Sequence, residues 1–340
     1  MRRARRSRSV KLLVVIVNYR SAELTIDCLR ALASEVPQIA GTQVVVTDND
    51  SGDGGAARIA SAIEREGWNS WACCRALPRN GGFAYGNNAA IEPALRSDDP
   101  PEYVLLLNPD TVPRPGALQA LLTFLEAHPE VGIAGSRLEY EDGTQHHSRF
   151  RFHTIRSEIV DGLRLGFVTK LLHRHMTAPP LVLHDHPIDW VAGASMMVRK
   201  QVFDAIGLFD EGYFLYYEET DFCLRAARAG WPCWYVPESR VVHLVGKSSG
   251  LTDVRVRAAR RPRYWFESRQ RYFAKNHGRL YAFFANLSWA LCYSVWRVRR
   301  RLQRKPDEDP PHLLADFVRF HFLRRTGDPA TSPARPSSTP

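Results

Sequence analysis

The sequence lacks several motifs that by themselves would assign a protein to a class, such as paired cysteines or a signal peptide. Its six cysteines, among 340 residues, show no paired spacing of the kind that binds zinc. Cys73 and Cys74 are adjacent, too close to bridge each other comfortably. The apolar run at residues 12–17 is short and no small-residue cleavage site follows it, which favours a strand over a signal peptide. We therefore expect reduced thiols in a cytosolic protein.

Two common nucleotide-binding motifs are missing as well. Neither the G-x-G-x-x-G fingerprint of hydride-transfer enzymes nor the complete phosphate loop that ends in Gly-Lys-Ser/Thr follows the first predicted strand. Gly81, Gly82 and Gly86 have the wrong spacing for both motifs. We expect these glycines to let the backbone pass close to a ligand or to support a turn.

Acidic residues are scarce in residues 251–305. Residues 251–305 hold fifteen Arg or Lys but only Asp253 and Glu267, and six more basic residues lie among the first eleven. Since the net charge is +10, the rest of the chain is mildly acidic. Such basic segments suggest nucleic acid or an anionic membrane surface, and the aromatic content of the second one favours the membrane.

What the sequence does contain is an alternation of strands and helices. Apolar, often β-branched runs predict strands at residues 12–17, 44–47, 71–76, 103–107 and 131–135, with helical patterns between several of them. Short connections between alternating elements favour a parallel sheet with right-handed crossovers.

Polar residues stand where four of these strands end: Asn18, Asp48, Asn80 and Asp110. Ligands of open α/β sheets bind beyond the carboxyl ends of the strands, so this convergence predicts a nucleotide crevice. The alternative is ordinary loop chemistry, because Asn and Asp are favoured in turns.

The middle of the chain is harder to interpret. Residues 136–188 contain seven histidines at no spacing that argues strongly for zinc, which indicates a variable surface segment. Residues 189–199 predict a strand with small residues in its middle, and 231–236 and 240–243 predict two short strands. His243 ends the last of them and could complete a metal shell with Asp110, although a lone histidine is more often structural.

Residues 207–230 hold a candidate general base. Glu218, Glu219 and Asp221 lie between an aromatic run and a segment of helical spacing. Carboxylates beside aromatic rings are poorly solvated, which raises their pKa and makes them better proton acceptors. Acidic residues in the first turn of a helix are also ordinary, because they complement its dipole.

Residues 280–296 carry no charge and are bracketed by arginines. The run is at the short limit for a membrane span, and Asn286 and Ser288 weaken that interpretation. An interfacial helix with snorkelling arginines fits better, and packing against the body or a second subunit is the other alternative. One last short helix is expected near residues 313–323, before a tail rich in Pro, Ser and Thr.

Five motifs together resemble, in order and spacing, the family 2 inverting glycosyltransferases, in particular their bacterial rhamnosyltransferase-like branch. They are VVIVNYR, VVVTDNDSGDGG, RNGGFAYGNN, LLLNPDT and GASMMVRKQVFDAIGLFDEGYFLYYEETDFCLR. The resemblance implies a GT-A fold, that is, a nucleotide-binding, mostly parallel α/β sheet flanked by helices. It also implies transfer of a sugar, such as the deoxyhexose rhamnose, from a nucleoside diphosphate sugar to a lipid-linked or polysaccharide acceptor.

The resemblance assigns the nucleotide and metal positions. Asn18, Asp48, Asn80 and Asn108 match positions that bind the nucleotide. Asn108-Pro109-Asp110 matches the DXD segment, whose last carboxylate binds a divalent ion, Mg²⁺ or Mn²⁺, shared with the diphosphate. Asn108 replaces the usual first Asp, so this site has one negative charge fewer. His243 matches a metal or phosphate contact.

The resemblance also assigns the reacting side of the site. Glu218-Glu219 stands where the family has a Glu-Asp pair, so Glu219 is the expected base, with Glu218 beside it. Asp221 and its partner four residues on, Arg225, are expected to form a structural pair. Trp190 and Gly193 match the region that lines the sugar pocket.

The predicted organisation has four parts. They are a basic tail (1–11), a GT-A domain (12–250), a basic, aromatic helical extension for membrane or oligomer contact (251–325) and a disordered tail (326–340). The protein is expected to be cytoplasmic and attached peripherally to the inner face of the plasma membrane, with no nucleic acid partner; a homo-oligomer is left open.

Three other functions remain open from the sequence. A sugar nucleotidyltransferase would share the sheet, but Arg20-Ser21-Ala22 does not supply its activating basic loop. A sugar-nucleotide-binding scaffold without turnover is supported only by the departures at Asn108 and Glu219. A nucleic-acid binder would use the arginines, but the chain lacks a recognisable module for it.

Overall fold

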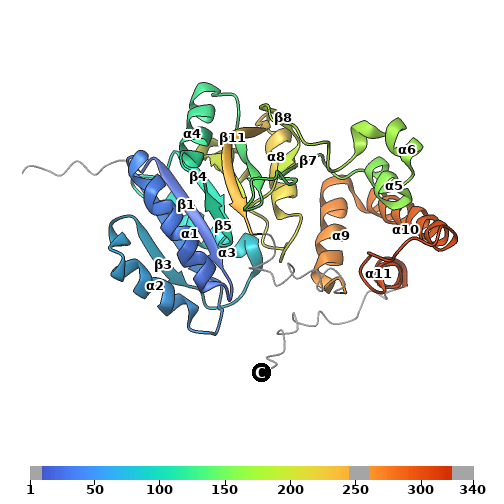
Figure 1. Cartoon of the computed structure of the whole chain (residues 1–340), viewed down its shortest axis with the longest axis horizontal. Coiled ribbons are helices and arrows are strands. Elements are labelled where there is room, and N and C mark those ends of the chain that lie inside the picture. Colours follow the sequence, from blue (N-terminus) through green and yellow to red (C-terminus); the bar gives the residue numbers. More distant parts are fainter. Residues whose placement is uncertain (1–9, 245–259, 324–340) are drawn as a thin grey trace, which may run out of the picture. The chain divides into compact units, whose positions relative to one another are not determined.

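The computed structural model describes residues 10–244 and 260–323, which fall into two compact units (Figure 1). The sheet unit takes residues up to Phe152, then Thr177–Phe214 and the described residues from Glu218 to 244. The helical unit takes His153–Met176, Leu215–Tyr217 and residues 260–323. The predicted boundary at residue 250 and nearly all of both predicted tails lie outside the described residues.

The sheet unit is built on a nine-stranded sheet in the order β3-β2-β1-β4-β10-β6-β11-β5, with β8 paired to β11. A separate pair joins β7 and β9. The strands are β1 (Leu12–Asn18), β2 (Thr42–Asp48), β3 (Ala72–Ala76), β4 (Tyr103–Leu107), β5 (Thr111–Pro113), β6 (Ile133–Glu139), β7 (Arg149–Phe150), β8 (His186–Ile188), β9 (Trp190–Val191), β10 (Ser195–Arg199) and β11 (Cys233–His243).

Helices cover both faces of this sheet, which explains the continuous apolar sequence of its central strands. Along β1, Leu12, Val14 and Ile16 pack into one core cluster, while Leu13 and Val15 pack into the other. The first cluster includes side chains of α1 (Ala22–Glu35), α2 (Gly55–Arg65) and α4 (Ala117–Ala127). The second includes side chains of α3 (Gly82–Leu95), α7 (Lys200–Ile206) and α8 (Glu218–Arg228).

The sheet is mixed and mostly parallel, which confirms the predicted fold class. The strands β3, β2, β1 and β4 pair in parallel, and Asn18 lies opposite Asp48 in the register. β10 runs antiparallel to both β4 and β6, with Ser195 opposite Leu107. The parallel pairing expected from the alternation of strands and helices thus holds for β3, β2, β1 and β4, whereas β10, β5 and β8 run antiparallel to their neighbours.

Two predicted strand boundaries were wrong. The run at 189–199 is not one strand, because it divides into β9 and β10 around the small residues at 192–194. The two short strands predicted at 231–236 and 240–243 are a single strand, β11, whose pairing with β6 shifts register between Val236 and Arg240. All six cysteines are free thiols, as expected.

The helical unit is organised around its longest helix, α10 (Arg279–Leu302). One face of α10 is buried, including Ala282, Ala285, Trp289 and Tyr293, at helical spacing. It contacts α5 (Ile155–Leu163), α9 (Arg263–His277) and α11 (Leu313–Val318); α6 (Gly166–Leu171) and a π-helical turn, Arg319–Leu323, complete the unit. Within the described ranges, no helix combines the length and hydrophobicity that crossing a membrane requires.

Candidate functional site

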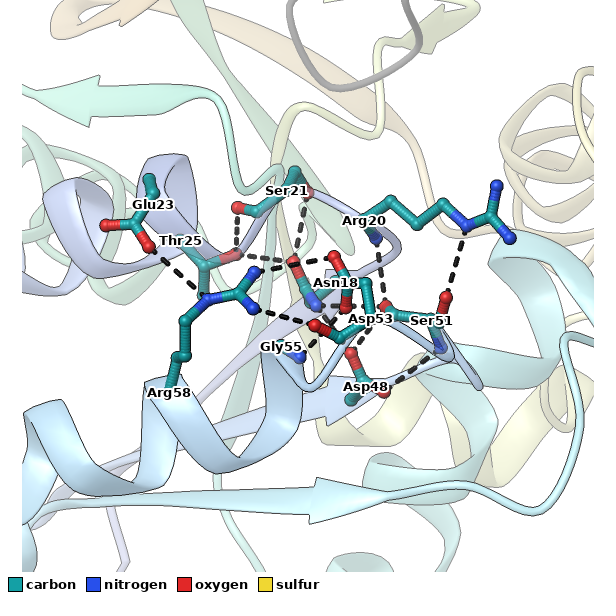
Figure 2. A network of polar contacts seen from close by, with 10 residues as sticks. All are labelled: Asn18, Arg20, Ser21, Glu23, Thr25, Asp48, Ser51, Asp53, Gly55 and Arg58. Carbon is teal, nitrogen blue, oxygen red and sulfur yellow. Dashed lines mark hydrogen bonds and ion pairs between the residues drawn. The ribbon is translucent and has the colours of Figure 1, made fainter. Parts of the chain in front are cut away.

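The carboxyl ends of β1 and β2 are joined by a buried network of polar side chains, which Figure 2 shows. Asn18 Nδ2 donates to Asp48 Oδ1 at 2.6 Å and to Ser51 Oγ at 3.3 Å. Asn18 Oδ1 accepts from the hydroxyl groups of Ser21 and Thr25, both at 3.0 Å. Asn18 and Asp48 are both buried. The network fixes the loops that follow these strands, at the rim where the sequence predicts a nucleotide.

Ser51 completes the coordination of Asp48 from the loop after β2. Its hydroxyl donates to Oδ1 at 2.6 Å and its N–H donates to Oδ2 at 3.2 Å. The buried carboxylate is thus hydrogen-bonded through both oxygens, as a buried charge requires. The sequence analysis missed Ser21, Thr25 and Ser51. The spacing of Ser51, three residues after an Asp, is a turn signal that would have indicated it.

Asn80 is held at the same rim by the loop after β2. Its Oδ1 accepts from Asn49 Nδ2 at 3.0 Å and from the Gly82 N–H at 3.1 Å. Asn49 also donates to the Gly82 carbonyl at 3.0 Å. The structure therefore brings Asn18, Asp48 and Asn80 to neighbouring loops, and their role in binding base and ribose stays a prediction.

Gly82 brings the start of α3 against the segment that leads to the acidic helix. Its φ is +86°, and a Cβ at this position would lie 1.9 Å from the carbonyl oxygen of Phe214. The N–H of Phe83 donates to that same oxygen at 2.9 Å. Only glycine permits this approach. The neighbour is the chain's own backbone, so the predicted approach of Gly81, Gly82 and Gly86 to a ligand stays a prediction.

A second cluster lies where β4 ends and β5 pairs with the end of β11. His243 is opposite Thr111 in that pairing. His243 Nε2 is 3.4 Å from Asp110 Oδ1 and 3.5 Å from Asn108 Nδ2, and Asp110 is buried. The structure thus brings Asp110 and His243, the two predicted metal ligands, together with Asn108, a predicted nucleotide contact. We call these three residues the metal corner.

The donor atoms of this corner suit a divalent ion only in part. A carboxylate, an imidazole and an amide oxygen are all acceptable ligands for Mn²⁺, and Mg²⁺ prefers the oxygens. Among the residues that the structure describes, no group of three or more His, Cys, Asp and Glu could hold a metal. Asp110 and His243 therefore fit an ion that takes its other ligands from substrate phosphates and water.

His146 also lies at this corner, although the sequence analysis left it in a variable surface segment. Its ring centre is 5.6 Å from that of His243. Burial, together with the nearby His243, lowers the pKa of His146 to about 4, so the imidazole is neutral at pH 7. Nothing in the local sequence distinguished His146 from its six neighbouring histidines, because strand pairing places it here.

The acidic helix α8 begins with the predicted catalytic pair. Glu218 is buried and Glu219 is half-buried. Asp221 accepts from Arg225 Nε at 3.0 Å and from the Tyr213 hydroxyl at 3.2 Å, which confirms it as part of a structural pair. Of the three carboxylates in the first turn, Glu218 and Glu219 remain the candidates for a base.

Two tyrosines directly before Glu218 have a left-handed backbone. The φ angles of Tyr216 and Tyr217 are +71° and +68°. For residues other than glycine, each such conformation costs about 1–3 kcal/mol of conformational free energy, and it persists only where packing and hydrogen bonds around it compensate. Both residues belong to the helical unit, in which Ser268 Oγ donates to the Leu215 carbonyl at 2.9 Å. Burial raises the pKa of Tyr217 to about 12.

Trp190 begins β9, and Gly193 lies in the break between β9 and β10. Trp190 donates through Nε1 to the Arg151 carbonyl at 3.0 Å and stacks on Phe150, with 4.4 Å between ring centres. A Cβ on Gly193 would lie 3.1 Å from the Phe83 ring. The next residue, Ala194, accepts from the Asn108 N–H at 3.1 Å, which places the Gly193 segment beside the metal corner. A sugar-binding role for either residue stays a prediction.

Comparison with known proteins assigns the chain to a family. Residues 10–283 match the model of the family described as "Glycosyltransferase like family 2". The chain is 28% identical over 232 residues to the N-acetylglucosaminyl-diphospho-decaprenol L-rhamnosyltransferase of Mycobacterium tuberculosis, covering 65% of this chain and 71% of that one. It is 29% identical over 166 residues to the rhamnosyltransferase WbbL of Escherichia coli K12, covering 48% and 60%.

A solved structure supports the fold. The mannosyltransferase PcManGT of Pyrobaculum calidifontis, in complex with GDP-Man and Mn²⁺, superposes with a TM-score of 0.54. The match covers 88% of this chain and 76% of that one at 15% identity, so the likeness concerns the fold alone.

Proposed function

This chain belongs to the glycosyltransferase-like family 2, and on that premise we propose that it is an inverting transferase that moves rhamnose from a nucleoside diphosphate sugar to a lipid-linked acceptor. The observation that carries the proposal is the single rim of the sheet unit. Loops that follow β1, β2 and β3 are tied together there, and the segment before α8 contacts one of them through Gly82. The metal corner stands at the end of β4, the next strand of the same sheet.

In the proposed reaction Glu219 acts as the general base. It takes the proton from the acceptor hydroxyl as that oxygen attacks the anomeric carbon, from the face opposite the diphosphate. The bond between the anomeric carbon and the diphosphate breaks as the glycosidic bond forms, so the configuration at this carbon inverts. Glu218, which is buried beside it, is the alternative carboxylate for this role.

Asp110 and His243 would hold a divalent ion together with the donor diphosphate. The ion would neutralise the charge that develops on the leaving diphosphate. Asn108 supplies an amide in place of a second carboxylate, so we expect the ion to bind weakly without the donor. PcManGT, which shares the fold, was solved with both GDP-Man and Mn²⁺ bound, and this supports the choice of ion.

The relatives' names support this choice of sugar and acceptor. Two of them are named as rhamnosyltransferases, and one of these names specifies an acceptor with a diphosphate on a decaprenol lipid. A polysaccharide acceptor is the second candidate. Sugar nucleotide synthesis and a scaffold without turnover are less well supported, because the matched family is one of glycosyltransferases, which use sugar nucleotides as donors.

Donor binding gives the direct test of this function. A nucleoside diphosphate rhamnose at a hundredfold excess over its Kd should stabilise the protein by about 2.7 kcal/mol, seen as a higher Tm. Mn²⁺ should increase this shift for the native chain but not for Asp110→Asn. Asp142→Asn, at an exposed turn, is the matched control and should behave as the native chain. If no nucleotide sugar raises the Tm with or without Mn²⁺, the proposal fails.

We further propose that the enzyme attaches peripherally to the inner face of the plasma membrane. The support comes from the solvent side of α10, where apolar residues recur at helical spacing and are each at least 47% exposed. This α10 stripe consists of Leu280, Phe283, Phe284, Leu291, Val295, Val298 and Leu302. Sedimentation with anionic vesicles should carry the full chain into the pellet, and a chain that stays in the supernatant would contradict the attachment.

A further inference from the structure

The helical unit contains a basic hollow that the proposed reaction does not use. Its volume is about 400 Å³, and four of its seven lining residues are arginines: Arg260, Arg261, Arg263 and Arg319. Asp316 is the only acidic residue among the seven, which leaves a formal excess of three positive charges. Such a concentration of guanidinium groups favours an anionic ligand.

Three of these arginines surround the N-terminus of α9. Arg263 is the first residue of the helix, Arg260 and Arg261 stand just before it, and the first turn holds no acidic residue. A helix N-terminus is the positive end of the helix dipole, so cations are unfavourable there and anions are favourable. The clustered arginines therefore work against the local electrostatics until an anion is bound.

The protein balances only part of this charge. Arg260 forms a paired interaction with Asp316, with distances of 2.5 and 2.6 Å, and Arg263 pairs with Glu267 at 2.6 Å. Arg261 lies over the Trp265 ring, 5.6 Å from its centre. In the described part of the chain, neither Arg261 nor Arg319 forms an ion pair. These two guanidinium groups are the ones left to bind a ligand.

The neighbours of the hollow are apolar. Phe266 and Phe320 line it, with 5.7 Å between their ring centres. Phe320 belongs to the π-helical turn Arg319–Leu323, and in the same turn Phe322 contacts Phe283 of the α10 stripe, with 5.8 Å between ring centres. The basic hollow and the exposed apolar stripe are therefore connected through one short segment.

We propose that this hollow binds the phosphate group of an anionic membrane phospholipid, while the α10 stripe contacts the acyl chains. Arginine forks pair with phosphate oxygens through two hydrogen bonds, and an amphiphilic ligand accounts for both the charge and the apolar stripe. The inference deepens the proposed membrane attachment and rests on it, but it does not depend on sugar transfer.

The test uses the full chain and the double variant R261Q/R319Q, which removes the two arginines that have no ion-pair partner among the described residues. Binding is measured by cosedimentation with phosphatidylcholine vesicles, with and without phosphatidylglycerol. The native chain should prefer the anionic vesicles, and R261Q/R319Q should bind them about tenfold more weakly, since each arginine near an anionic surface contributes severalfold to affinity. The control R156Q/R174Q removes the same charge from exposed residues of the same unit and should change binding less than about twofold.

Several results would overturn the proposal. Equal losses in the two double variants would show that general charge, and not the hollow, governs binding. Arginine-dependent binding to neutral vesicles that carry a polyprenyl diphosphate, but not to phosphatidylglycerol vesicles, would assign the hollow to the lipid-linked acceptor instead. Arginine-dependent binding of inorganic pyrophosphate or single-stranded DNA without vesicle binding would exclude a lipid. The donor-induced Tm shift, measured on the same variants, reports separately on the transferase function.

Discussion

Replacement of Glu219 by Gln is expected to lower the rate of sugar transfer by about 10²–10⁴-fold while leaving donor binding nearly intact. The amide keeps the size of the side chain but cannot accept the proton of the acceptor hydroxyl. Glu219 lies in the first turn of α8 and is half-buried, so the substitution should not disturb the core. The measurement is product formation from rhamnosyl donor and acceptor, with the donor-induced Tm shift recorded in parallel.

Two further variants make this result specific. Glu64→Gln changes an exposed glutamate on α2 in the same way and should leave turnover unchanged. Glu218→Gln separates the two candidate bases: a large loss there, with Glu219→Gln active within about tenfold, would transfer the role to Glu218. If both glutamine variants keep turnover within tenfold, the proposed base chemistry is wrong.

Arg269→Met is expected to lower the free energy of unfolding by about 3–5 kcal/mol. Arg269 Nη2 lies 2.8 Å from Glu158 Oε2, and both side chains are buried in the helical unit. Burial opposes ionisation of Glu158, but Arg269 and His153 outweigh it and hold the pKa of this carboxyl below its usual range. Without the guanidinium, a buried carboxylate would remain uncompensated. Urea unfolding, followed by a signal from the helical unit, measures the loss.

The double variant Arg269→Met/Glu158→Gln is the control, because it removes both charges. It should recover a large part of the lost free energy of unfolding, as buried ion pairs replaced together often do. A double variant no more stable than Arg269→Met would show that the packing of Arg269, and not its charge, stabilises the unit.

The pH dependence of the free energy of unfolding tests the role of Arg269 independently. In the native chain the lowered pKa of Glu158 contributes stability above its unfolded value of about 4.3, and this contribution is lost as the pH falls through the folded pKa. In Arg269→Met, burial should raise the pKa of Glu158, so the free energy of unfolding should increase as the pH falls from neutral. A variant that loses stability on acidification as the native chain does would contradict this account.

The parallel half of the fold could be predicted from the sequence because burial on both faces leaves a plain signal. The run at 12–17 has no room for solvent-facing residues, and it is β1 in the structure. The direction of β10 could not be predicted in the same way, because a buried strand has the same apolar sequence whether it pairs parallel or antiparallel. Strand direction depends on the path of the connections, which the local sequence does not record.

The residues that meet at the site could be predicted where a polar residue directly follows a predicted strand, because the strand fixes where that residue lies. Asp110 and His243 meet although they are far apart in the chain, and Asn18 meets Asp48 across the register of β1 and β2. The contributions of Ser51 and His146 were not predictable, because hydroxyl groups and histidines are common in loops and only the folded chain selects one of them. The roles of these residues with a bound donor stay predictions.

The reversed direction of β10 has a consequence for how the chain tolerates change. Because Ser195 lies opposite Leu107, the amino end of β10 lies at the same rim of the sheet as the carboxyl ends of β1 and β4. Its carboxyl end, at Arg199, lies opposite Tyr103 at the other end of the strands. Lengthening the polypeptide just before Ser195 would therefore alter which molecules fit at the site. An equal insertion soon after Arg199 would lie at the other end of the strands, away from the site. Engineering of substrate specificity should therefore start from insertions just before Ser195.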